Sequence, residues 1–138
     1  MDDTTFKEVP VGTAAVFTKT VSESDVYLYA GISGDFSPNH IDEEYMKGGR
    51  YGQRVAHGTL LLGFMSAASA RLYLGRTASM GYDRVRFIAP VFLGDTIRTE
   101  YKVRDYDLVK KRVFADVTCT NQRGEVVAAA VNIRAYVG

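Results

Sequence analysis

The chain contains only two histidines, one close to an aspartate and the other beside a glycine, and both lie at predicted junctions of loop and helix, where small enzymes often keep acid–base groups. His40 follows Asp35 by five residues, with Pro38 between them. A bent loop can bring a carboxylate and an imidazole to one point, where they would hold a water molecule and move its protons. In the structural alternative, Asp35 caps a turn or short helix and His40 lies on the surface. Spacing alone favours this structural interpretation.

His57 and Gly58 stand at the predicted start of a long apolar helix. The first backbone N–H groups of a helix have no partner within it, and the helix dipole favours negative charge there. Because glycine lets a ligand approach the backbone closely, the Gly58 N–H is suited to a thioester oxygen that gains negative charge. In the alternative, Gly58 serves close packing and a carbonyl satisfies His57. Alone, this pair is a weak indication of function.

The sequence carries no other familiar catalytic pattern. A glycine-rich phosphate loop, Cys/His metal spacing and a nucleophile elbow are all missing from it, and a net charge of +1 gives no basis for nucleic-acid binding. Cys119 is the only cysteine, so an intrachain disulfide is excluded, and its alternating segment places it in the core. A single unpaired cysteine suits a reducing cytoplasm. The chain opens without a secretory leader pattern, and the longest apolar stretch, about 13 residues, is too short to cross a bilayer.

Length and composition indicate one domain over residues 1–138, with 46% hydrophobic and 24% charged residues. Ser22 and the acids after it predict a helix over residues 23–31. Pro38 predicts irregular backbone over 33–38, and a short helix follows over 42–46. The apolar segment 56–74 predicts a helix that is buried on every side.

Alternating patterns predict an early strand over residues 14–21 and four later strands over residues 84–88, 95–104, 112–120 and 125–136. Residues 121–124 form a turn that joins the last two strands into a hairpin, whereas Gly75, Arg76, Gly81 and Tyr82 are expected in loops. An antiparallel sheet wrapped around one central helix satisfies both patterns. The predicted class is therefore α+β.

Three ordered blocks resemble the MaoC-like, or hydratase-2, family of hot-dog-fold proteins. The signature Gly-Asp-x-Asn-Pro-x-His-x-Asp corresponds to residues 34–42, the Ala-His-Gly block to residues 55–60, and a third block to residues 85–91 and 94–97. The resemblance implies a hot-dog fold and a homodimer or a dimer of dimers. It also implies (R)-specific hydration of trans-2-enoyl thioesters of CoA or acyl carrier protein, with no metal or redox cofactor.

The resemblance assigns roles to individual residues. Asp35 and His40 would activate a water molecule, and the Gly58 N–H would hold the thioester oxygen. Substrate contacts are expected from Phe36, Ser37, Arg54 and His57, with Arg54 facing the CoA phosphates or lying in a solvated loop. His57 is also expected to be a positioning residue at the helix start. Tyr45, Tyr51 and Leu62 join Phe36 as candidates for the acyl pocket.

Ser37 departs from the family signature, which has asparagine at this position. Serine keeps one hydroxyl but is shorter, so an altered substrate or rate is expected with the same chemistry. Two alternatives remain: a hot-dog subunit that binds acyl thioesters without turning them over, and a thioesterase. The intact Asp35 and His40 argue against a pure binding protein.

Overall fold

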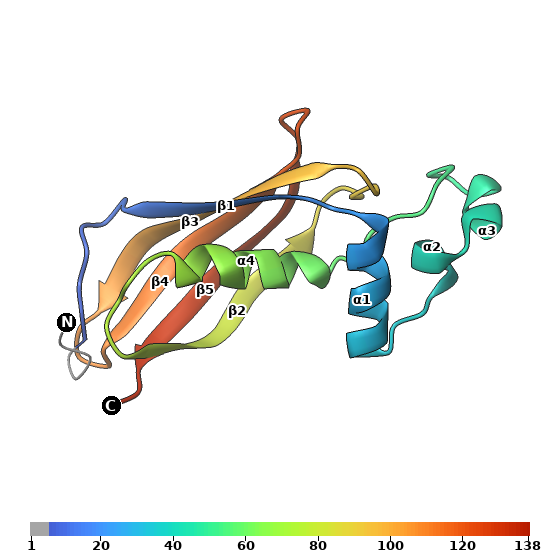
Figure 1. The fold of residues 1–138 in the computed structure, drawn as a ribbon. Helices are drawn as coiled ribbons and strands as arrows, with labels where there is room; N and C mark the ends of the chain where they lie inside the picture. Colours follow the sequence, from blue (N-terminus) through green and yellow to red (C-terminus); the bar gives the residue numbers. More distant parts are fainter. Residues whose placement is uncertain (1–5) are drawn as a thin grey trace.

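The computed structural model describes residues 6–138, which build one antiparallel sheet around one helix (Figure 1). The strands are β1 (Ala14–Thr20), β2 (Thr77–Phe87), β3 (Thr96–Asp107), β4 (Arg112–Thr120) and β5 (Val126–Tyr136). Their spatial order is β1-β3-β4-β5-β2, so the consecutive hairpins β3–β4 and β4–β5 form the middle of the sheet. The predicted architecture, a sheet wrapped around a central helix, is confirmed.

Helix α4 (Leu60–Ala70) lies in the concave face of this sheet. Its buried side chains, including Leu61, Phe64 and Met65, pack against inward-facing residues of β1, β3, β4 and β5. Phe64 meets Phe17 of β1 with ring centroids 5.8 Å apart. Cys119 is fully buried in the same core, as expected, and burial raises the pKa of its thiol.

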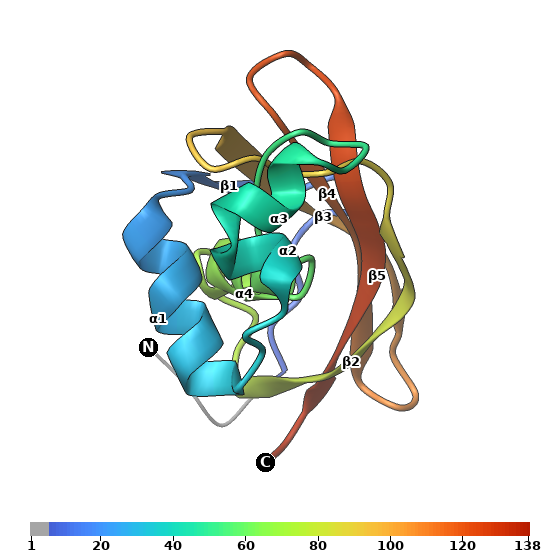
Figure 2. The ribbon, with the colours of Figure 1, turned by 90° about the vertical axis from the view of Figure 1, so that its right-hand side faces the viewer.

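Three further helices cover the N-terminal end of α4, as the end-on view shows (Figure 2). They are α1 (Glu23–Ser33), α2 (Pro38–Ile41) and α3 (Glu43–Lys47). The predicted cap of α1 is confirmed as a capping box, in which Ser22 and Asp25 each accept a hydrogen bond from the other's backbone N–H. The helix runs two residues beyond the predicted end at residue 31 and stops at Gly34, whose φ of 85° suits glycine.

The prediction of a helix over residues 56–74 was wrong at both ends, because α4 covers only Leu60–Ala70. At the start, Val55 bridges to Phe92 and the Ala56 N–H donates to the Val91 carbonyl, so sheet-like pairing holds this segment extended. The helix is also not buried on every side, since Gly63, Ser66 and Ala70 are exposed. Within residues 6–138, no helix is long and apolar enough to cross a membrane.

Strand β2 was underestimated, since it begins at Thr77 rather than near Arg84 and contains Gly81 and Tyr82, which were expected in a loop. Two shifts in its register against β5, between Ser79 and Gly81 and between Asp83 and Arg86, interrupt the alternation. Arg84 has a positive φ of 55° at the second shift. A pattern of period two cannot be followed across such bulges.

Candidate active site

The segment between α1 and α2 turns sharply and carries Asp35. Gly34 ends α1 in the left-handed conformation, and Pro38 occupies the first turn of α2, where its missing N–H is no loss. Helix α2 was not predicted, because residues 33–38 were expected to be irregular and the next helix was expected only from residue 42. It directs His40 back toward Asp35, which spacing alone did not indicate.

Asp35 and His40 face each other at the N-terminal end of α4. Asp35 Oδ2 lies 3.6 Å from His40 Nε2, which is too long for a direct hydrogen bond. The side chain of His40 is 12% exposed, while that of Asp35 is 44% exposed. The predicted meeting of the two groups is therefore present, at a separation that one water molecule hydrogen-bonded to both would span.

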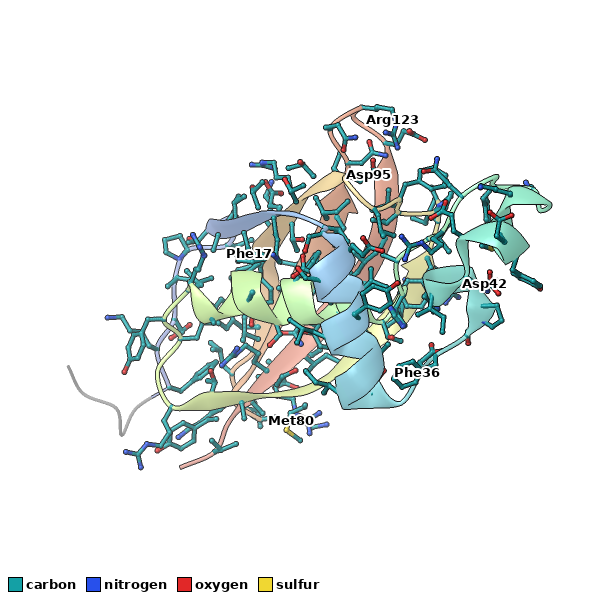
Figure 3. The ribbon with its side chains drawn as sticks, turned by 45° about the vertical axis from the view of Figure 1, so that its right-hand side comes forward. Phe17, Phe36, Asp42, Met80, Asp95 and Arg123 are labelled. Atoms are coloured by element: carbon teal, nitrogen blue, oxygen red, sulfur yellow. The ribbon has the colours of Figure 1, made fainter. Side chains whose placement is uncertain are left out.

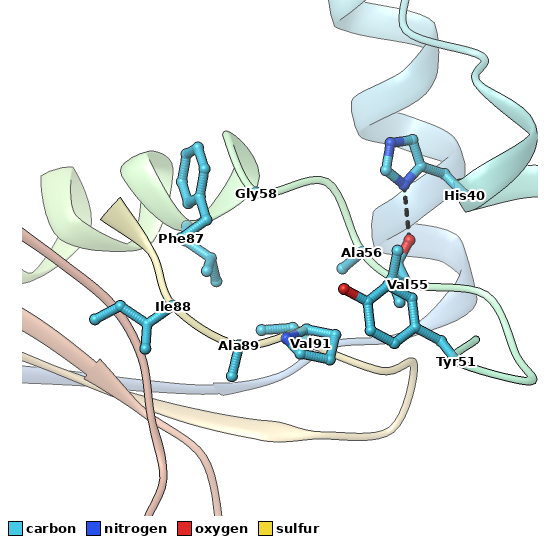
Figure 4. A pocket seen from close by; sticks show the side chains of 11 residues that line it. His40, Tyr51, Val55, Ala56, Gly58, Phe87, Ile88, Ala89 and Val91 are labelled. Atoms are coloured by element: carbon cyan, nitrogen blue, oxygen red, sulfur yellow. Dashed lines mark hydrogen bonds between the residues drawn. The ribbon is translucent and has the colours of Figure 1, made fainter. Parts of the chain in front are cut away.

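The tautomer of His40 follows from its second nitrogen. His40 Nδ1 lies 2.7 Å from the Val55 carbonyl oxygen (Figure 4). A carbonyl oxygen only accepts hydrogen bonds, so Nδ1 carries the hydrogen and, in the neutral ring, Nε2 presents a lone pair. Two acceptors, Asp35 Oδ2 and His40 Nε2, thus point toward the same region.

Ser37 holds the Asp35 carboxylate through its other oxygen. The Ser37 hydroxyl donates to Asp35 Oδ1 at 2.6 Å, and the Ser37 backbone N–H donates to the same atom at 3.0 Å. These two hydrogen bonds, the hydroxyl bond above all, lower the pKa of the Asp35 carboxyl, with smaller contributions from His40 and His57. The carboxylate is therefore ionised at neutral pH, and its Oδ2 remains available.

His57 lies beneath this pair and is 1% exposed. Its Nε2 lies 2.9 Å from the Asp35 carbonyl oxygen, and its ring stacks on that of His40 with centroids 3.7 Å apart. The edge of Tyr29 packs against it from α1, at a centroid distance of 4.8 Å. One ring nitrogen of His57 is thus satisfied by a carbonyl, as the structural alternative expected, and that carbonyl belongs to the catalytic candidate Asp35.

A cavity of about 250 Å³ opens beside His40 and Gly58 (Figure 4). Apolar side chains form most of its wall, and the residues around it are His40, Tyr51, Val55, Ala56, Gly58, Leu61, Phe87, Ile88, Ala89, Pro90 and Val91. The Phe87 ring lies directly over Gly58, since a Cβ placed there would be 3.0 Å from the ring. Among the described residues, no group accepts the Gly58 N–H. The cavity thus joins an imidazole, a free backbone donor and an apolar wall.

Arg54 forms a junction between helices. Its guanidinium donates to Glu23 of α1 and to Glu43 of α3, both at 2.8 Å, and its side chain is largely buried. These contacts fix the residue before Val55, whose carbonyl holds His40. Two carboxylates already surround the guanidinium, and binding of CoA phosphates by Arg54 stays a prediction that nothing in the structure tests.

The remaining predicted contact residues lie in different settings. Ser37 and His57 both contact Asp35, whereas Phe36 is exposed on the surface after α1 and does not line the cavity (Figure 3). Of the acyl-pocket candidates, Tyr51 lines the cavity, and Tyr45 and Leu62 do not. Residues 87–91 were missed as cavity wall, although the third family block drew attention to this segment.

The Asp35, His40 and His57 side chains each offer a ligand atom within 4.8 Å of the others, so a metal ion must be considered. A ring nitrogen binds metal through the lone pair in its ring plane, and the two rings stack with only 26° between their planes. Their lone pairs therefore run side by side instead of converging on a tetrahedral or octahedral centre. The expectation of no metal remains a prediction that this geometry favours.

Several known proteins are similar to this chain. The MaoC like domain matches residues 7–125. The chain is 38% identical over 115 residues to the (R)-specific enoyl-CoA hydratase of Rhodospirillum rubrum, covering 83% of this chain and 80% of that protein. It is 34% identical over 122 residues to the 3-hydroxybutyryl-CoA dehydratase of Methylorubrum extorquens, covering 88% and 76%. The unliganded R-hydratase PhaJ1 of Pseudomonas aeruginosa superposes with a TM-score of 0.85 at 34% identity, covering 94% of this chain and 83% of that one.

Proposed function

The chain belongs to the family of MaoC-like domains, and from that membership we propose that it is an (R)-specific enoyl-CoA hydratase, which also catalyses the reverse dehydration. Membership confirms the resemblance carried by the three sequence blocks and, with it, the hot-dog fold. The observation that carries the proposal is the pair of acceptors, Asp35 Oδ2 and His40 Nε2, which lie 3.6 Å apart, with His40 lining the cavity. The similar proteins are named for enoyl-CoA and 3-hydroxybutyryl-CoA, which supports CoA thioesters as the substrate class.

In the proposed reaction, one water molecule donates a hydrogen bond to Asp35 Oδ2 and another to His40 Nε2. Both protons of the water are then held by the protein, and an oxygen lone pair faces the substrate. One acceptor removes a proton from the water as its oxygen bonds to C3 of the enoyl thioester, and the same proton, returned to C2, completes the addition and restores the acceptor. The product is the (R)-3-hydroxyacyl thioester.

The electrons displaced from the double bond move onto the thioester oxygen. We propose that this oxygen lies at the Gly58 N–H, at the N-terminal end of α4, where the helix dipole favours developing negative charge. The half-exposed Phe87 ring lies over Gly58 and forms part of the wall of the acyl cavity. Acid–base groups and an oxyanion donor are sufficient for this reaction, so we propose that no metal or redox cofactor takes part.

We propose that the chain acts as a homodimer on CoA or acyl carrier protein thioesters, in the reducing cytoplasm that a single free cysteine suits. Strand β2 is an edge of the sheet, and it exposes Met80 and Phe87. Leu28 and Ile32 are exposed on α1. An unpaired edge with apolar side chains favours association with a second copy. Light scattering during gel filtration tests this, with a mass near twice 15.2 kDa expected.

The loss of enoyl-thioester absorbance with crotonyl-CoA tests the activity directly. We expect hydration by the wild type, and a loss of about 100-fold or more in Asp35→Asn and in His40→Ala, the usual scale for a positioned acid or base. Circular dichroism should show both variants folded. Activity within a few fold of wild type in either variant would remove the proposed pair.

A panel of enoyl-CoAs of different chain length, with chiral analysis of the product, extends the test. Formation of the (R)-alcohol supports the proposal. Tight binding without any absorbance change across the panel contradicts it and favours a binding subunit. Release of free thiol from saturated acyl-CoA, without hydration, contradicts it in favour of a thioesterase.

A further inference from the structure

We propose that His57 is a positioning residue for hydration: as the Nε2–H tautomer, it holds the Asp35 backbone so that the carboxylate faces His40. This inference rests on the hydratase function proposed above, and it assigns His57 no contact with the reacting atoms. It gives a mechanism to the positioning role expected for His57 from the sequence blocks, in place of the substrate contact that was also expected. Four observations, set out below, carry it.

The first observation is the direction of the hydrogen bond between His57 and Asp35. The Asp35 carbonyl oxygen can only accept, so His57 Nε2, at 2.9 Å, must be the donor. The bond spans 22 residues of sequence and joins the segment before α4 to the loop after α1. It is therefore a tertiary constraint on the backbone of the proposed catalytic acid.

The second observation concerns Nδ1, the other ring nitrogen of His57. His57 Nδ1 is buried and has no hydrogen-bond partner among the described residues. A proton on Nδ1 would add a buried donor without an acceptor, beside an imidazole that already stacks on the ring. The surroundings thus select one tautomer, with hydrogen on Nε2 and a bare Nδ1.

The third observation is that the ring itself is clamped. His40 of α2 lies on its face at 3.7 Å and Tyr29 of α1 meets it edge-on at 4.8 Å. The Tyr29 hydroxyl in turn donates to Thr59 at 2.7 Å, which ties α1 to the start of α4. A ring held by α1, α2 and the α4 entrance cannot turn away, so its Nε2–H keeps a constant direction.

The fourth observation is that Asp35 needs such a constraint. Its carboxylate is 44% exposed, and its side-chain hydrogen bonds both come from Ser37, two residues away in the same loop. Those local bonds orient the carboxylate within the loop but do not fix the loop against His40. Among the described residues, the link from His57 to the Asp35 carbonyl is the hydrogen bond that does this directly.

Two substitutions separate the donor from the ring. His57→Phe keeps a flat ring against His40 but removes the donor, whereas His57→Gln can place an amide N–H near the position of Nε2. With crotonyl-CoA, we expect His57→Phe to lower kcat by about tenfold or more with KM within about threefold, because misplacing a reacting group costs rate more than binding. We expect His57→Gln to recover most of that loss.

Tyr101→Phe is the control for a general loss of stability. It removes a buried hydroxyl that donates to Asn132 at 2.7 Å in the core, away from the cavity. We expect its melting temperature to fall while kcat stays at the wild-type value. Equal losses of kcat in Tyr101→Phe and His57→Phe would overturn the positioning role, as would a His57→Gln variant no better than His57→Phe.

A measurement without turnover completes the test. Nitrogen–proton correlation spectra of labelled histidine should show His57 as the Nε2–H tautomer at neutral pH, with assignments from the His57→Gln variant. An Nδ1–H tautomer would overturn the inference even if the enzyme is active. A wild type that fails to hydrate any enoyl-CoA would instead defeat the proposed function, so the two failures are distinguishable.

Discussion

Asp35 and Asp95 are two acids whose pKa values are both lowered, yet their surroundings are opposite. Asp95 lies at the end of the sheet below Arg123 (Figure 3), and its side chain is 6% exposed. Burial alone would raise the pKa of Asp95, but hydrogen bonds from Arg123, Gln122 and the Phe92 N–H lower it. Asp35 is 44% exposed, and its pKa is lowered mainly by Ser37.

The difference lies in which oxygens are already used. Asp95 Oδ1 accepts from Gln122 and Arg123, and Asp95 Oδ2 accepts from Phe92 and Arg123, so both oxygens are satisfied. Asp35 Oδ1 accepts both bonds from Ser37, which leaves Oδ2 facing His40. A lowered pKa therefore does not mark a catalytic acid by itself. Unused hydrogen-bonding capacity beside a cavity is the better indication.

The sharpest test of this comparison replaces each acid by its amide. Asp35→Asn should lose about 100-fold or more of hydration activity with little change in stability, since its carboxylate is half-exposed. Asp95→Asn should show the reverse: a loss of about 2 kcal/mol of unfolding free energy, because charged hydrogen bonds are weakened, with activity per folded molecule retained. Urea unfolding and crotonyl-CoA hydration measure the two effects.

Each amide variant serves as the control for the other. If Asp95→Asn lowers kcat as strongly as Asp35→Asn does, Asp95 also takes part in the reaction. Unused hydrogen-bonding capacity then does not distinguish the catalytic acid. If Asp35→Asn mainly unfolds the protein, its carboxylate is structural, as spacing alone suggested.

Several features of the fold were predicted correctly from local sequence. The Ser22 cap of α1, the hairpin turn before β5 and the alternation in β3 and β4 all depend on near neighbours, and each was predicted. The core position of Cys119 followed from the same alternation. Patterns of period two or 3.6 report which face of an element is buried, and that information is local.

The site itself required tertiary contacts. The approach of Asp35 to His40 depends on α2, a single turn that begins at Pro38 and is too short to leave a periodic pattern. The hydrogen bond from His57 to the Asp35 carbonyl depends on pairing of residue 55 with Phe92, far along the chain. Family resemblance supplied the roles of these residues, but their tautomers and unused atoms follow only from the folded arrangement.

Gly58→Ala tests the second unused group, the Gly58 N–H. The added methyl would lie 3.0 to 3.1 Å from the Phe87 ring, which must shift outward and disturb the cavity beside the oxyanion position. We expect kcat/KM to fall by about tenfold, a partial loss of the effect of one oxyanion donor. Gly31→Ala is the matched control, because a Cβ there meets no atom within 4 Å, and it should leave activity unchanged.

A normal rate in Gly58→Ala would show that the thioester oxygen does not depend on this position. Combining the change with Phe87→Leu sharpens the result, because a smaller side chain relieves the crowding. Recovery in the double variant assigns the loss to the displaced ring, and continued loss assigns it to the backbone donor.

The pH dependence of unfolding distinguishes the stability contributions of the Asp35 and Asp95 carboxylates. A lowered folded pKa means that the carboxylate adds stability above its unfolded pKa, about 3.9, and that this stability disappears as pH falls through the folded pKa. The stability difference between wild type and Asp95→Asn should therefore be full at pH 7 and shrink in acid. A difference independent of pH would show that Asp95 acts through packing alone. The corresponding difference for Asp35→Asn should be small throughout, because solvent screens a half-exposed group.

Ser37→Ala makes the smallest change and tests how the loop prepares Asp35. It removes the hydroxyl hydrogen bond to Oδ1 but keeps the backbone one, so the pKa of Asp35 should rise toward its usual value. Because the ionised form accepts the water proton, the acid limb of kcat/KM should move to higher pH, while the rate at pH 7 changes by no more than a few fold. Ser37→Asn restores a side-chain donor and should move the limb back. An unchanged limb in Ser37→Ala would mean that another group sets it, and that the departure of Ser37 from the family asparagine leaves the ionisation of Asp35 untouched.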